Sequence, residues 1–150
     1  QLCDISNLLL QKWPAPEFSI TTCLHLEQMK EGDVAGLVSL GGCYTALAVR
    51  KKDGKMILQQ RTGNWTKADE VRTELGEWNS DVICLQMRVE KENYRTFLVG
   101  TSEEALQPVG EMVEATPGRW VGVKDGLFAI NEQGTEGGSL AADYFVYQDL

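Results

Sequence analysis

The chain has 150 residues, of which 43% are hydrophobic and 24% charged, a composition typical of one globular domain. Its formal net charge of −8 at neutral pH argues against nucleic-acid binding, which depends on clustered lysine and arginine. No run of apolar residues approaches the ~18 that a membrane helix needs, so the sequence predicts no membrane span.

Short segments that favour strands follow one another along the chain, and no long segment shows a helical period. Residues 18–26 alternate apolar with polar side chains, and residues 34–40 are mostly apolar, as in a strand buried on both faces. The further strands expected cover residues 44–49, 56–61, 71–75, 82–90, 94–99, 107–113, 126–129 and 141–147.

Turn signals separate these strands. Gly41-Gly42 and Asp53-Gly54 predict tight turns, and the Asp-Gly pair is among the strongest short-range hairpin signals. Residues 64–70 are expected to form a loop. Residues 102–106 fit either one helical turn capped by Ser102 or a simple loop.

The C-terminal region has the pattern of a hairpin, with residues 126–129 pairing with residues 141–147 across a Gly-rich loop. Tyr144 and Phe145 are expected to point to opposite faces, so this last strand has something to cover on both sides. About ten short strands without repeats or a linker predict one all-β domain over residues 1–150, an antiparallel two-sheet sandwich.

The cysteines offer no disulfide or zinc pattern. They are far apart and form no CxxC pair, and the single His25 has no ligand neighbours in the sequence. Buried free thiols are therefore expected, which favours a cytoplasmic location, with a periplasmic or secreted location as the alternative. The four cysteines are Cys3, Cys23, Cys43 and Cys84.

No catalytic constellation stands out. The 22 acidic residues fall chiefly in turns and on polar strand faces, and none lies in an apolar context that would raise its pKa. Nucleophile motifs and Gly-rich phosphate loops are missing. The sequence thus predicts no stand-alone enzyme.

The tryptophans are the candidates for sugar contact, because sugar rings stack on flat aromatic faces. Trp13, Trp65 and Trp78 lie in loop-like segments, where each is either an exposed platform or a cap on the edge of the core. Trp120 opens a strand and is expected in the core.

Four motifs occur in the same order as in a known family. They are residues 7–18 (NLLLQKWPAPEF), 31–37 (EGDVAGL), 126–128 (GLF) and 143–145 (DYF). This order resembles the C-terminal domain of family 43 glycoside hydrolases. Those β-xylosidases and α-L-arabinofuranosidases join a five-bladed propeller to a concanavalin-like β-sandwich.

The resemblance implies a jelly-roll sandwich of the concanavalin type whose partner, the propeller, carries the chemistry. It implies that the loop after Phe128, running through Asn131 and Thr135 to Gly138, reaches the rim of the propeller's active site. Phe128 is the aromatic expected at a sugar subsite, with ordinary core packing as the alternative. The substrate-contact candidates are Phe128, Asn131, Thr135, Trp65 and Trp78; no catalytic residue and no metal ligand is expected in this chain.

Two departures from the family pattern bear on these expectations. The chain begins almost at the leucine run, so it is expected to be excised from a longer protein, with its first strands missing. Asp143 is expected to be a hydrogen-bonding residue at a strand end, with a calcium ligand as the alternative, and no cofactor is predicted.

The resemblance and the missing catalytic residues favour a non-catalytic accessory domain of a glycosidase that acts on xylan- or arabinan-type polysaccharides. An autonomous carbohydrate-binding module, which holds a neutral oligosaccharide on its exposed tryptophans, is the second hypothesis. A docking domain without sugar affinity is the third.

Overall fold

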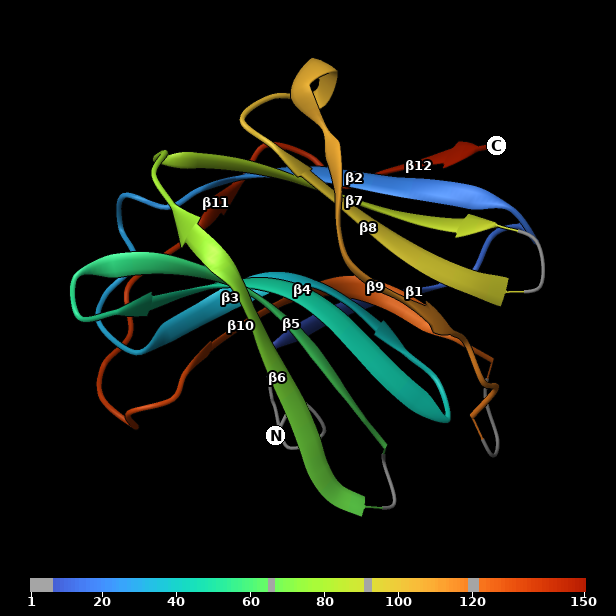
Figure 1. Cartoon of the computed structure of the whole chain (residues 1–150), viewed down its shortest axis with the longest axis horizontal. Coiled ribbons are helices and arrows are strands. Elements are labelled where there is room, and N and C mark those ends of the chain that lie inside the picture. The colour runs from blue at the N-terminus through green and yellow to red at the C-terminus, as the bar shows by residue number, and fades with distance from the viewer. Residues whose placement is uncertain (1–6, 65–66, 91–92, 119–121) are drawn as a thin grey trace.

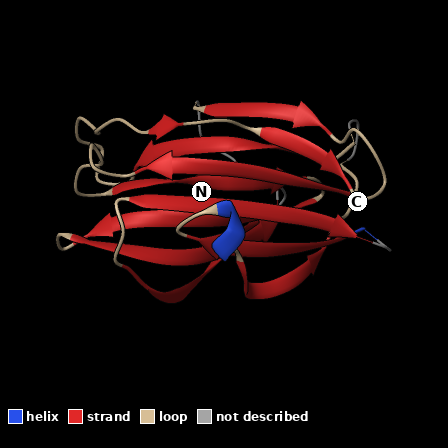
Figure 2. Ribbon diagram, turned by 90° about the horizontal axis from the view of Figure 1, so that it is seen from above, coloured by secondary structure: helices blue, strands red, loops and turns tan. Residues whose placement is uncertain are grey.

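The computed structural model describes residues 7–64, 67–90, 93–118 and 122–150. They form two antiparallel six-stranded sheets that pack face to face (Figure 1), with the connecting loops gathered mainly at the two ends of the strands (Figure 2). Sheet A has the order β1-β10-β3-β4-β5-β6, and sheet B has the order β11-β2-β7-β8-β9 with β12 also paired to β2. The predicted all-β sandwich is confirmed.

The strands are short and mostly joined by turns. Sheet A contains β1 (Leu8–Lys12), β3 (Asp33–Leu40), β4 (Cys43–Lys52), β5 (Lys55–Asn64), β6 (Lys67–Trp78) and β10 (Lys124–Asn131). Sheet B contains β2 (Phe18–His25), β7 (Val82–Glu90), β8 (Tyr94–Gly100), β9 (Gln107–Glu114), β11 (Ala141–Ala142) and β12 (Val146–Asp149).

Central position in a sheet explains the burial of β3. It lies between β10 and β4, and all eight of its residues are buried, as the mostly apolar sequence of this segment predicts. The Asp-Gly hairpin between β4 and β5 is also confirmed. Asp53 and Gly54 both adopt positive φ, at 52° and 74°, the geometry that a two-residue hairpin loop requires.

Successive side chains of a strand point to opposite faces, and in sheet A each face carries an apolar cluster. On β3, Ala35 and Leu37 belong to the main core between the sheets. Val34 and Val38 belong to a second cluster on the other face of sheet A. That outer face also carries Arg61, which is paired in register with Ala46 of the second cluster.

Three expectations about the path of the chain are wrong. Of the loop expected at 64–70, Asn64 ends β5, and residues 67–70 join the short strand after them in one long strand, β6; residues 65–66 lie outside the described residues. In addition, β1 was not expected as a strand. The C-terminal hairpin does not form. β10 pairs with β1 and β3 in sheet A, whereas β11 and β12 pair with β2 in sheet B. Local alternation predicts a strand but does not say which sheet it joins.

The details of the last segment agree better with the sequence. Phe145 packs on the main core, while the hydroxyl of Tyr144 turns away to bind Glu103 in the 3-10 turn Glu103–Ala105. Asp143 pairs with His25 at 2.8 Å, the hydrogen-bonding role predicted for it. Ser102 precedes the 3-10 turn but makes no capping side-chain bond.

The expectation of free thiols is wrong for two of the cysteines. Cys23 and Cys84 are direct register partners on β2 and β7 and form a disulfide. Their separation in sequence hid this pairing, because strand register is not a local property. Cys43 is a free cysteine, and Cys3 lies outside the described residues.

In the part of the chain that the structure describes, no helix is long and apolar enough to cross a membrane.

Candidate functional site

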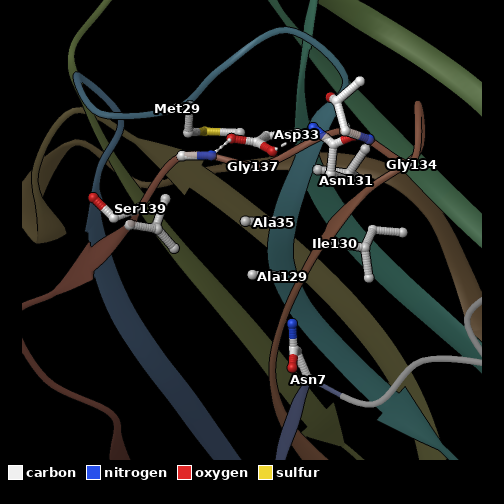
Figure 3. A pocket seen from close by; sticks show the side chains of 14 residues that line it. Asn7, Met29, Asp33, Ala35, Ala129, Ile130, Asn131, Gly134, Gly137 and Ser139 are labelled. Atoms are coloured by element: carbon white, nitrogen blue, oxygen red, sulfur yellow. Dashed lines mark hydrogen bonds between the residues drawn. The ribbon is translucent and has the colours of Figure 1, made fainter.

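A cavity of about 450 Å³ lies beside the loop that follows β10, the loop expected at the active-site rim (Figure 3). The start of β3 and the end of β10 form one side, with Ala35 and Ala129 between the polar residues at its two ends. None of the described lining residues is aromatic. They are Asn7, Met29, Asp33, Val34, Ala35, Ala129, Ile130, Asn131, Gly134, Thr135, Gly137, Gly138, Ser139 and Leu140.

Asp33 anchors this loop at the start of β3. Its carboxylate accepts hydrogen bonds from the backbone N–H groups of Lys30 at 2.7 Å and Gly138 at 2.8 Å. The side-chain amide of Asn131 donates a third bond at 2.9 Å. Burial alone would raise the pKa of Asp33, but these donors outweigh it and hold the pKa below its ordinary value.

Asn131 organises the loop from within. Its amide nitrogen donates to Asp33 and to the carbonyl of Glu31 at 3.1 Å. Its amide oxygen accepts from the backbone of Gln133 at 3.0 Å and from the hydroxyl of Thr135 at 3.3 Å. The polar groups of Asn131 are therefore engaged in holding the loop, and those two predicted residues, Asn131 and Thr135, are brought together at the cavity.

The loop returns so close to residues 28–30 that only glycine fits at Gly138. A Cβ atom there would lie 2.0 Å from the carbonyl oxygen of Gln28, which is backbone and cannot yield. The nearby bond from Ser139 N–H to the same carbonyl, at 3.2 Å, shows how tightly these segments pack.

We expect Gly138→Ala to destabilise the domain by about 1 to 3 kcal/mol, because the added methyl must displace one of two backbone segments. Chemical denaturation measures the change. Gly122→Ala is the matched control, since a Cβ at Gly122 meets nothing within 4 Å. Equal stability of the two variants would contradict the close packing of this loop.

The other predicted contact residues lie elsewhere. Phe128 is 2% exposed and belongs to the second apolar cluster, in which side chains of the neighbouring strands β1 and β3 pack around it. The structure thus supports the core alternative for Phe128. The indole N–H of Trp78 donates to the carbonyl of Val82, and its ring packs against the main core. Trp65 and Trp120 lie outside the described residues.

Trp13 also packs at the edge of the main core and is not an isolated aromatic ring free to stack on a sugar. Its ring meets Phe18 edge-on, with the ring centres 5.4 Å apart. Trp13 lines a second, largely apolar cavity of about 340 Å³ together with Pro117 and Val123.

Sequence reasoning missed one buried acid. Asp125 is fully buried on the inner face of sheet A, and burial raises its pKa to about 6. Ser39, Trp13 and Arg95 lie close enough to moderate this shift, but neither carboxylate oxygen makes a hydrogen bond of normal geometry. The alternation of β10 was the available signal, since Asp125 shares its inward face with Leu127.

Asp125 does not form a catalytic pair. Glycoside hydrolysis uses two carboxyl groups that face each other across the scissile bond. Asp125 is enclosed in the sandwich, and the described groups that interact with its charge are Ser39, Trp13, Arg95 and Tyr147, none of them an acid. Among the described residues, no group of three or more His, Cys, Asp or Glu is arranged to hold a metal ion.

A family model for the β-xylosidase C-terminal concanavalin A-like domain matches residues 2–148. The chain belongs to this family. The match covers the fold and the loop described above, and it identifies the sandwich as the accessory C-terminal domain found in family 43 glycoside hydrolases. Comparison with curated proteins found no relative.

Solved structures share this fold. A bifunctional GH43-CE protein of Bacteroides eggerthii superposes with a TM-score of 0.85 at 22% identity, over 97% of this chain and 19% of that one. A xylan β-1,4-xylosidase of Bacillus halodurans C-125 gives a TM-score of 0.78 at 22% identity, over 96% of this chain and 30% of that one. The chain therefore spans less than a third of either protein. A legume lectin-like domain of Entamoeba histolytica is more distant, with a TM-score of 0.61 at 11% identity, over 93% and 76%.

Proposed function

We propose that this chain is the non-catalytic accessory domain of a family 43 glycosidase that acts on xylan- or arabinan-type polysaccharides. In this proposal the sandwich packs on a catalytic propeller and places the loop 132–138 at the rim of its active site. The observation that carries the proposal is the family match over residues 2–148.

Two further observations support it. Family 43 structures that share this fold are much longer than the chain, which covers 19% to 31% of the length of three of them. One of them is described as an engineered enzyme with both endo-xylanase and exo-arabinofuranosidase activity. The second observation is the loop itself, which Asp33 and Asn131 hold in one defined shape at the end of sheet A.

The described tryptophans favour this function over an autonomous sugar-binding module. Trp13 and Trp78 both pack on the main core, and the indole N–H of Trp78 is already bonded to Val82. A binding module needs flat aromatic faces that are free to stack on sugar rings, and the cavity beside the loop offers none among its described lining residues.

We expect the isolated 150-residue chain neither to hydrolyse aryl β-D-xylosides or α-L-arabinofuranosides nor to bind xylo- or arabino-oligosaccharides at millimolar concentration. Chromogenic assays and titrations followed by tryptophan fluorescence measure both. The full-length parent protein should hydrolyse at least one of these substrates. Hydrolysis by the isolated chain would overturn the proposal, and millimolar binding lost in Trp78→Ala would favour the binding module.

A further inference from the structure

The first residue of the loop, Glu132, is held by arginines from three neighbouring strands. Its Oε1 atom lies 2.8 Å from Nη1 of Arg61 on β5 and 3.0 Å from Nη1 of Arg72 on β6. Its Oε2 atom lies 3.3 Å from Nε of Arg50 on β4. The Glu132 side chain is 14% exposed, so solvent screens these contacts only weakly.

Arg61 is the fixed member of this cluster. Its side chain is fully buried, whereas those of Arg50 and Arg72 are 26% and 40% exposed. The Nε atom of Arg61 donates to Oε1 of Gln59 at 2.7 Å, which sets the plane of the guanidinium group. A buried arginine held in this way presents its Nη1 at a defined position.

Glu132 is ionised at neutral pH. Burial alone would raise the pKa of Glu132, but the bond from Arg61 and the positive charges of Arg61, Arg72 and Arg50 outweigh it and lower the pKa. The attraction between this carboxylate and Arg61 is therefore present at neutral pH.

The loop is consequently held on both faces of sheet A. Asn131 points inward and bonds Asp33, while the next residue, Glu132, points outward and bonds Arg61. The backbone N–H of Glu132 also donates to the carbonyl of Gly32 at 2.9 Å. Two consecutive residues thus fix the base of the loop from opposite sides.

We infer that Arg61, acting through Glu132, is a positioning residue that holds the loop 132–138 in one preset conformation for substrate binding. This inference rests on the proposed function, because it assumes that the loop lies at the rim of the propeller's active site. The loop is then a fixed wall of that site and does not close over the substrate as a lid.

The test uses the full-length glycosidase with aryl β-D-xyloside and α-L-arabinofuranoside substrates. Glu132→Gln keeps the size of the side chain but removes its charge, and we expect KM to rise on the order of tenfold while kcat changes less than about twofold. Arg61→Lys should give the same pattern. Lysine keeps the positive charge but lacks the planar guanidinium group that bonds Gln59 and Glu132 at the same time. The double variant Glu132→Gln/Arg61→Lys should raise KM no more than either single variant, because both substitutions break the same interaction.

Glu77→Gln is the matched control, since Glu77 forms an exposed ion pair with Lys55 in the same sheet, at 2.8 Å. It should leave KM and kcat unchanged. Unchanged KM in Glu132→Gln, or a loss of kcat that parallels a loss of thermal stability, would overturn the inference.

A loop-replacement variant separates this inference from the proposed function. Residues 133–137 are replaced by a Gly-Ser segment of equal length. If the replacement raises KM but Glu132→Gln does not, the loop acts at the rim and Arg61 is not its positioning residue. If the replacement leaves KM unchanged, the loop has no place at the rim and both proposals fail.

Discussion

Replacing Asp125 with asparagine is expected to stabilise the folded domain at pH 7 by about 3 kcal/mol. The reason is that burial raises the pKa of Asp125 from 3.8 to about 6, so that at pH 7 the folded chain must hold an ionised carboxylate away from water. Between pH 4 and 6 the folded chain binds more protons than the unfolded one. The contribution of Asp125 to stability is therefore fully present below about pH 4 and is lost as the pH rises through 6.

Urea denaturation between pH 4 and 8 measures this effect. The free energy of unfolding of Asp125→Asn, minus that of the parent chain, should be near zero at pH 4 and largest above pH 7. A difference that does not vary with pH would show that Asp125 has an ordinary pKa and that Ser39, Trp13 and Arg95 compensate for its burial.

Asp33→Asn provides a comparison of opposite sign. The pKa of Asp33 is lowered, so its ionised form contributes stability that is present above the ordinary pKa and is lost as the pH falls through the lowered value. Asparagine at this position replaces an acceptor-only carboxylate by an amide, which disturbs the bonds from Lys30 and Gly138. We therefore expect Asp33→Asn to destabilise the domain at pH 7, and the pH profiles of the two variants to diverge.

The sequence predicted the parts of the fold that depend on local signals. Alternation in residues 18–26 and 82–90 predicted β2 and β7, and Asp53-Gly54 predicted the hairpin between β4 and β5. The order of motifs also predicted the family, which the match over residues 2–148 confirms. Each of these signals lies within a short stretch of chain.

The features that were missed depend on register between distant strands. The pairing of Cys23 with Cys84 and the assignment of the last strands to sheet B are set by which strands become neighbours. At the candidate site, sequence analysis named Asn131 and Thr135 but not Asp33 or Glu132. Those two acids matter because the topology brings β3, β5 and the loop together, and their spacing in the sequence carries no such signal.

Removal of the disulfide is expected to have the other large effect on stability. The bond joins residues 61 positions apart, and closing a loop of that length in the unfolded chain corresponds to about 4 kcal/mol in the loop-entropy treatment. The double variant Cys23→Ser/Cys84→Ser should therefore unfold at a much lower urea concentration than the parent, with a steeper transition, because the unfolded chain without the cross-link is less compact and exposes more surface.

Reduction of the parent chain offers the same comparison without a mutation. Dithiothreitol should lower its urea midpoint to that of the double variant and leave the double variant itself unchanged. Titration of thiols in the denatured chain should find two more after reduction than before. Cys43→Ser is the matched control, because Cys43 is a free cysteine, and the urea midpoint of this variant should remain sensitive to reductant.

An identical midpoint with and without reductant in the parent would mean that the link between β2 and β7 contributes nothing to stability. The pairing of these two central strands would then rest on their backbone ladder and on core residues such as Ile20, Leu24 and Ile83.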